Sequence, residues 1–137
     1  MSDGRLYLIG GGDFNKVPES MTECNEIDLV NNTFITRDKM KYPRHGHSAC
    51  SLGEKFIVVT GSRKENDSAQ LRVEIYNADL DLWFEAANLN EGRHYHASCS
   101  FLDRFIYVFA GISNASKKYI NSIEKFDNQT KKAWEVI

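Results

Sequence analysis

The residues best suited to chemistry in this chain are its four histidines. They form two His-x-His pairs, His45/His47 and His94/His96. Side chains two residues apart on a strand point to the same face, so two pairs on neighbouring strands could converge on a metal ion. No carboxylate or cysteine completes a ligand set in this pattern. We favour the alternative that the second histidine of each pair is a repeated structural position held by a hydrogen bond within its own repeat unit, and we predict no metal and no cofactor.

A search for a nucleophile with its general base finds no catalytic set. Ser48, Ser98 and Ser100 lie near histidines on the expected strands. Such proximity is expected by chance and does not indicate a catalytic set. The run Gly10-Gly11-Gly12 ends an apolar segment and opens no helix, so it is not a phosphate-binding loop. We therefore predict that the chain is not an enzyme.

Three apolar runs, each ending in two small residues, organise the rest of the chain. They start at Leu6, Ile57 and Ile106, which are 51 and 49 positions apart. Repetition at such a long period indicates repeated structural units. The runs are apolar without alternation, which predicts strands covered on both faces.

Each unit is predicted to hold up to four strands, and no amphipathic helix is apparent, so the fold class is all-β. Turn-forming residues separate the strands. The expected strands are 5–10, 23–29 and 33–36 in the first unit, 45–52, 55–60, 71–76 and 82–87 in the second, and 94–102, 105–110, 120–126 and 133–137 in the third.

The units share a fixed skeleton. Arg44 of the second unit recurs as Arg93 in the third, 49 positions later. An apolar or aromatic residue precedes a second aromatic by seven positions in the first two units and by eight in the third. These spaced residues are Ile27 and Phe34, Tyr76 and Trp83, and Phe126 and Trp134.

This skeleton resembles the kelch repeat, which combines an arginine, an apolar strand ending in two glycines, and a tyrosine spaced from a tryptophan. The period agrees with the roughly 50 residues of a kelch unit. The glycine doublet is intact only in the first unit and is Gly61-Ser62 and Ala110-Gly111 in the others. Because these replacements are small, we expect the packing role of the doublet to survive.

The resemblance implies a partial β-propeller of four-stranded antiparallel blades. The expected blades are 1–43, which lacks its first strand, 44–92 and 93–137. Phe34, Trp83 and Trp134 are expected to fill the wedges between adjacent sheets.

About two and three-quarter blades cannot close a kelch-type ring, and three explanations stay open. The chain is a portion of a longer propeller, it completes a ring with a second copy, or it is an open arc docked on another protein. In each case the outer sheets present apolar faces, which mark interaction sites.

One face of the expected propeller collects the connections between blades and the loops after the apolar strands. Arginine and tyrosine are enriched at binding hot spots, and loops on a rigid scaffold often carry function. The alternative for the two arginines is a structural role, bonded to backbone or to a glutamate. The predicted partner-binding residues are Arg44, His45, Arg63, Arg93, His94, Tyr95 and Asn114, with Asp13, Asn15, Lys64 and Lys117 beside them.

The amino-acid composition limits the classes of binding partner that we expect. The net charge is -2 with 26% charged residues of mixed sign, which gives no footprint for nucleic acid or an anionic membrane. The apolar runs are too short to span a membrane. Cys24, Cys50 and Cys99 lack CxxC spacing, so we expect free thiols and a cytoplasmic location.

The resemblance implies a protein-binding module for another protein or peptide. In other kelch chains this role is substrate recognition in cullin-type ubiquitin ligases, or scaffolding. A ligase role would depend on sequence outside this chain, because no BTB segment is present. The rival hypothesis is a kelch-type enzyme acting on sugars, of the copper oxidase or sialic-acid mutarotase class. A purely structural arc is the third possibility.

Overall fold

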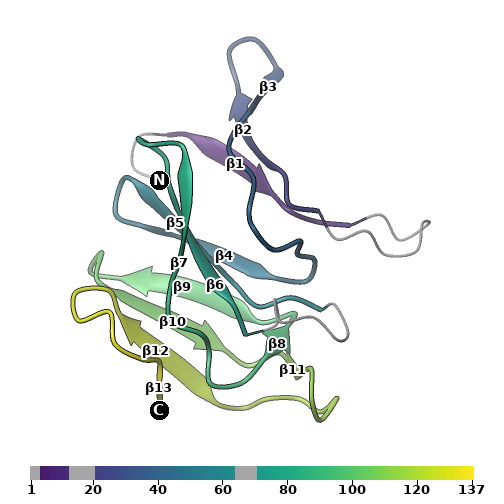
Figure 1. Cartoon of the computed structure of the whole chain (residues 1–137), viewed down its shortest axis with the longest axis vertical. Coiled ribbons are helices and arrows are strands. Elements are labelled where there is room, and N and C mark those ends of the chain that lie inside the picture. Colours follow the sequence, from purple (N-terminus) through teal and green to yellow (C-terminus); the bar gives the residue numbers. More distant parts are fainter. Residues whose placement is uncertain (1–3, 13–20, 64–70) are drawn as a thin grey trace.

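The computed structural model describes residues 4–12, 21–63 and 71–137, and strands are the only regular elements among them. Three antiparallel sheets of three or four strands follow one another in chain order (Figure 1), and a two-stranded ribbon forms a fourth, smaller sheet. The first sheet has the order β1-β2-β3 and contains β1 (Leu6–Ile9), β2 (Cys24–Asp28) and β3 (Thr33–Thr36). No helix in these ranges is long and apolar enough to cross a bilayer.

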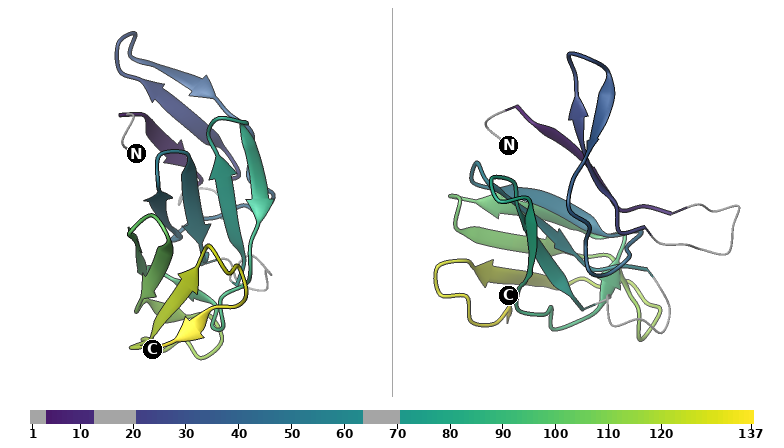
Figure 2. Two further views of the ribbon diagram at one scale, coloured as in Figure 1. Left: turned by 90° about the vertical axis from the view of Figure 1, so that its left-hand side faces the viewer. Right: turned by 45° about the horizontal axis from the view of Figure 1, so that its top comes forward.

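The second and third sheets have four strands each. The second sheet runs in the order β4-β5-β6-β7, with β4 (Ser48–Leu52), β5 (Phe56–Thr60), β6 (Val73–Asn77) and β7 (Leu82–Glu85). The third sheet runs in the order β9-β10-β12-β13, with β9 (Ala97–Phe101), β10 (Phe105–Phe109), β12 (Ile123–Asp127) and β13 (Glu135–Val136). Consecutive sheets stack in a fan (Figure 2), which confirms the prediction of an all-β partial propeller.

Two cores lie between the sheets, and β5 contributes to both. Ile57 and Val59 pack in the first junction, between the first and second sheets, while Val58 packs in the second junction, between the second and third sheets. All three side chains are at most 6% exposed. Because both faces of β5 are covered, its sequence is apolar without alternation, as expected.

The tryptophans tie each sheet to the connection before it. Trp134 is 4% exposed, stacks on Phe126 and donates its Nε1–H to the Ala87 carbonyl at 2.8 Å. Trp83 makes the same bond to the Asp38 carbonyl at 2.7 Å. Trp83 and Trp134 therefore pack between adjacent sheets, as predicted.

The wedge-filling prediction is wrong for Phe34. Its side chain is 65% exposed. No other described sheet lies on that side of the first sheet to cover the ring, and phenylalanine has no N–H to donate.

The innermost strands of the second and third sheets start later than predicted. β4 begins at Ser48 and β9 at Ala97, because Gly46 and Tyr95 turn the backbone with φ values of 63° and 53°. The residues before Tyr95 form a separate ribbon, in which β8 (Arg93–His94) pairs with β11 (Ile112–Ser113). The sequence pattern did not predict this ribbon.

The glycine doublets let one sheet approach the next. A Cβ added to Gly61 would lie 2.3 Å from the Arg93 carbonyl oxygen, and one added to Gly10 would lie 2.9 Å from that of Arg44. Ala110 is the equivalent residue of the third sheet and carries a real methyl group there, with φ 55°. By analogy with the two junctions, this methyl would hold a following sheet further off. No sheet lies beyond Ala110 among the described residues, so the expected packing role stays a prediction there.

Candidate partner-binding face

Arg44 lies in the interior of the second sheet. It is 0% exposed, and its Nε and Nη2 donate to Glu74 Oε2 at 3.2 and 2.9 Å. Its Nη1 donates to the carbonyls of Gly61 and Arg72 at 2.9 and 2.8 Å. The other oxygen of Glu74 accepts the Lys41 backbone N–H at 2.7 Å.

Arg93 repeats this arrangement in the third sheet. It is 0% exposed and donates from Nη2 to Glu124 Oε1 at 2.6 Å and from Nη1 to the Ala110 carbonyl at 3.0 Å. Glu124 Oε2 accepts the Asn90 backbone N–H at 2.7 Å. With Arg44 also enclosed, neither arginine offers an atom to a partner. The structure corrects their assignment as contact residues and favours the structural alternative.

Arg63 and Tyr95 form the exposed part of the predicted face. Arg63 Nη1 donates to the Tyr95 hydroxyl oxygen at 3.0 Å, and its guanidinium lies 5.7 Å from the ring centroid. Tyr95 is 53% exposed, and its backbone N–H bonds to the Gly46 carbonyl at 2.8 Å. The contact joins the end of the second sheet to the start of the third, so both side chains are held in place.

Buried polar groups support this pair from behind. His94 Nδ1 hydrogen-bonds to Asn114 Oδ1, and Asn114 Nδ2 donates to the Ser62 carbonyl at 2.7 Å. Burial lowers the pKa of His94, so its ring is neutral at physiological pH. The ring packs edge-on against Tyr95 at 5.0 Å.

His45 is also buried, at 8% exposure, and its carbonyl accepts the Arg63 backbone N–H at 2.9 Å. The structure thus brings Arg63, His94, Tyr95 and Asn114 together, with His45 beneath them. Three further predicted neighbours, Asp13, Asn15 and Lys64, lie outside the described residues.

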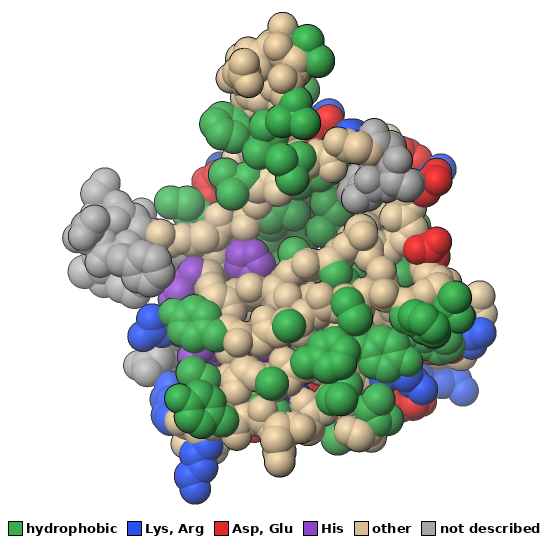
Figure 3. Space-filling view, turned by 180° about the vertical axis from the view of Figure 1, so that it is seen from behind, with side chains coloured by type: hydrophobic (Ala, Val, Ile, Leu, Met, Phe, Trp, Pro, Cys, Tyr) green, Lys and Arg blue, Asp and Glu red, His purple; other side chains and the backbone are tan. Residues whose placement is uncertain are grey.

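Sequence reasoning missed Tyr119 on this face. Tyr119 is 90% exposed and bridges to Ile112, which belongs to the same ribbon as His94. Lys117 and Lys118 precede it and are also exposed. Figure 3 shows Lys and Arg side chains along the edge of the molecule where the histidines lie. The available signal was an aromatic residue beside two lysines in a loop.

The second histidine of each pair has a structural role, but the hydrogen bond of His96 crosses between two sheets, which corrects the expectation of a bond within its own unit. His96 Nε2 hydrogen-bonds to Thr60 Oγ1 at 2.8 Å across the second junction. The Nδ1 atoms of His47 and His96 are buried without a partner. Burial lowers the pKa of His47 to about 4 and that of His96 to about 3, so both rings are neutral. Across residues 4–12, 21–63 and 71–137, no group of three or more His, Cys, Asp or Glu could hold a metal ion.

The chain is similar over most of its length to several proteins named for the kelch repeat. It is 23% identical over 132 residues to a RING finger domain and kelch repeat-containing protein of Dictyostelium discoideum. The aligned region covers 96% of this chain and 13% of that protein. It is 28% identical over 111 residues to human Kelch-like protein 23, covering 80% of this chain and 19% of the relative.

A third relative extends this match to almost the entire chain. Kelch-like protein 40 of Xenopus tropicalis is 25% identical over 134 residues, covering 98% of this chain and 21% of the relative. The chain therefore spans about a fifth or less of the length of the three relatives. No family model matches it.

Proposed function

Because the chain is built of kelch-type repeats, we propose that it is a protein-interaction module and that its binding face is centred on Tyr95 and Arg63. The kelch relatives support protein-protein interaction in general. The finer proposal is that the module recognises a substrate protein or holds partners as a scaffold.

The observation that carries the proposal is the exposed Arg63–Tyr95 pair. Its hydrogen bond of 3.0 Å and the buried His94–Asn114 support fix both side chains before any partner arrives. A side chain that is already ordered loses little conformational entropy on binding. Tyrosine and arginine are also the residue types that dominate binding hot spots.

The charge near this pair favours a partner with acidic groups. Arg63, Lys117 and Lys118 are exposed on this face. Such charges at the rim of an interface raise the association rate, and salt screens them. We therefore expect the affinity for the natural partner to fall as ionic strength rises.

The proposal is tested by placing a photo-crosslinking amino acid at Tyr95 in the full chain inside cells. The control carries the same group at Leu102, which is 73% exposed in the turn at the far end of β9. A protein captured from position 95 and absent from position 102 is then purified, and its dissociation constant is measured.

The Tyr95→Ala and Arg63→Ala variants should weaken that complex by about tenfold or more, as for hot-spot residues, and Leu102→Ala should not. Equal capture from both positions, or unchanged affinity of both face variants, would contradict the proposal.

No observation on the described residues specifically favours the enzyme hypothesis. The described residues contain no cluster suited to copper, and His45 and His94 are buried rather than presented to a substrate. We also propose a cytoplasmic location, which the three unpaired cysteines support. Further sheets, from a longer chain or a second copy, are proposed to cover the open faces of the first and third sheets.

A further inference from the structure

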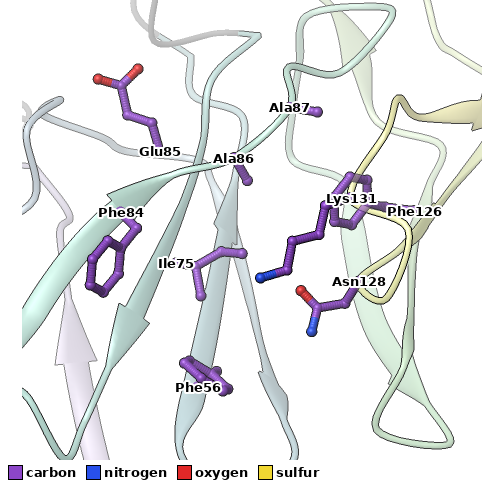
Figure 4. Close-up of a pocket in the computed structure, with 9 residues that line it drawn as sticks. All are labelled: Phe56, Ile75, Phe84, Glu85, Ala86, Ala87, Phe126, Asn128 and Lys131. Atoms are coloured by element: carbon purple, nitrogen blue, oxygen red, sulfur yellow. The ribbon is translucent and has the colours of Figure 1, made fainter.

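The second junction contains a pocket of about 450 Å³ between β5–β7 and the end of β12 (Figure 4). Its walls are mainly apolar and include Phe56, Ile75, Phe84 and Phe126. Ligand pockets in proteins span about 300–1,000 Å³ and combine apolar walls with a few polar groups. The pocket is therefore large enough for a small molecule.

Comparison of the repeats shows that the first junction carries long charged side chains at positions equivalent to those lining this pocket. The Arg37 N–H bonds to the Cys24 carbonyl as the Ala86 N–H bonds to the Val73 carbonyl, so Arg37 and Ala86 are equivalent. By the same register, Glu26 is equivalent to Ile75, because each faces the third residue of the next strand.

Long charged side chains fill the first junction at these positions. Arg37 Nη2 donates to Glu26 Oε2 at 2.6 Å, and the Tyr7 hydroxyl donates to the same oxygen at 3.2 Å. Arg5, which is equivalent to Phe56, reaches the Ala78 carbonyl at 3.5 Å. In the second junction the substitution of Arg by Ala86 and of Glu by Ile75 leaves the space empty and apolar.

Two polar side chains face this space. Figure 4 shows the Lys131 ammonium and the Asn128 amide directed toward Ile75 and Phe56, whereas the Glu85 carboxylate points away. Within the part of the chain that the structure describes, neither the Lys131 nor the Asn128 side chain forms an ion pair or hydrogen bond. Glu85 is engaged by Lys41 and Arg72 instead.

We propose that this pocket binds a small-molecule monocarboxylate with a flat apolar body. The apolar body lies against Phe56, Ile75 and Phe126, and the carboxylate accepts hydrogen bonds from Lys131 and Asn128. A charge-assisted hydrogen bond at the mouth of an apolar site fixes the orientation of such a ligand. The proposal is independent of the partner-binding face, because none of the residues that line the pocket belongs to that face.

The test measures binding of 2-naphthoate to the full chain by isothermal titration calorimetry, with 2-naphthol as the uncharged probe. Ala86→Arg places in the pocket the residue that fills the first junction, and Ile75→Glu with Ala86→Arg recreates the whole ion pair. Both should lower naphthoate affinity by about tenfold or more. Circular dichroism and thermal unfolding show whether each variant is folded.

Lys131→Met should weaken naphthoate binding about fivefold to tenfold and leave naphthol binding unchanged, since only the carboxylate uses the ammonium group. Lys132→Met is the matched control and should change neither. The proposal is overturned if wild-type chain binds no naphthoate, if a folded filled-pocket variant binds it as wild type does, or if Lys131→Met affects both probes equally.

Discussion

At the scale of single residues, Gly61 shows how closely the sheets approach one another. Its position faces the backbone of Arg93 and the ring of His96, at 2.3 and 2.6 Å from an added Cβ. Its φ of +68° is also strained for any other residue. Two separate costs therefore fall on any substitution there.

We expect Gly61→Ala to destabilise the chain by at least about 2 kcal/mol, from backbone strain and displacement of the third sheet. Gly53→Ala is the control, because Gly53 has a similar φ of +61° and an added Cβ there would meet no atom closer than 3.9 Å. Urea unfolding of both variants gives the comparison. Equal losses would mean that strain alone, and not the close approach, requires Gly61.

The buried histidines make stability depend on pH. The pKa is about 4 for His47 and about 3 for His96 in the folded chain, below the usual value of 6.5. The unfolded chain therefore binds protons first as the pH falls below 6.5. Stability should drop between pH 6.5 and about 3, by about 2 kcal/mol per histidine at pH 5 relative to pH 7.5.

Urea unfolding at pH 7.5 and pH 5 measures this drop. His96→Gln should be less stable than wild type at pH 7.5 but lose less on acidification. An identical loss in wild type and variant would show that other groups cause the acid sensitivity.

At the scale of elements, the Arg–Glu pairs hold each four-stranded sheet together. Arg44 and Glu74 are at most 1% exposed, and their bonds connect the approach to β4 with β6 and with the connection at Lys41. In the first sheet, Asn25 pairs with Thr36 as Glu74 pairs with Glu85, so Asn25 stands where a glutamate would be buried. The described part of the first sheet has no strand equivalent to β4 and therefore no equivalent of Arg44. The neutral side chain of Asn25 avoids burying a charge that would have no partner.

We expect Glu74→Ala to cost about 3–5 kcal/mol, because it leaves the Arg44 charge buried without its partner. Combining Glu74→Leu with Arg44→Met should restore much of that loss. Arg104→Ala is the control, since the Arg104–Asp127 pair is partly exposed and should be worth about 1 kcal/mol or less. If the double variant is as unstable as Glu74→Ala, the backbone bonds of Arg44 matter more than its charge.

The strands could be predicted from sequence because each unit repeats the same apolar, turn and aromatic spacing. The roles of Arg44 and Arg93 could not be decided, since their spacing is the same whether they are buried or exposed. A signal was present in Glu74 and Glu124, which repeat 50 positions apart. The ribbon β8–β11 has only two residues per strand, too few to give a periodic pattern.

At the scale of the whole molecule, the two outer sheets leave one face each uncovered. Leu8 on the first sheet is 54% exposed and Phe101 on the third is 55% exposed, although each lies in a strand. Contiguous apolar surface of this kind promotes association.

We therefore expect the isolated chain to self-associate as its concentration rises from about 5 to 100 μM, a range over which weak apolar contacts form. Analytical ultracentrifugation should show a smaller mean mass for Leu8→Glu and for Phe101→Glu. Val30→Glu, at an exposed turn, is the control. A wild-type chain that stays monomeric throughout would argue against unsatisfied sheet faces.

Ala110 also makes the stack of sheets directional. The two internal joints are tight because a hydrogen atom, rather than a methyl group, meets the neighbouring carbonyl. A sheet placed beyond β10 would have to stand further off, and it would lose part of the interlocking that Gly10 and Gly61 permit. Under force or heat, the joint between the third sheet and such an added sheet should open before the two internal joints.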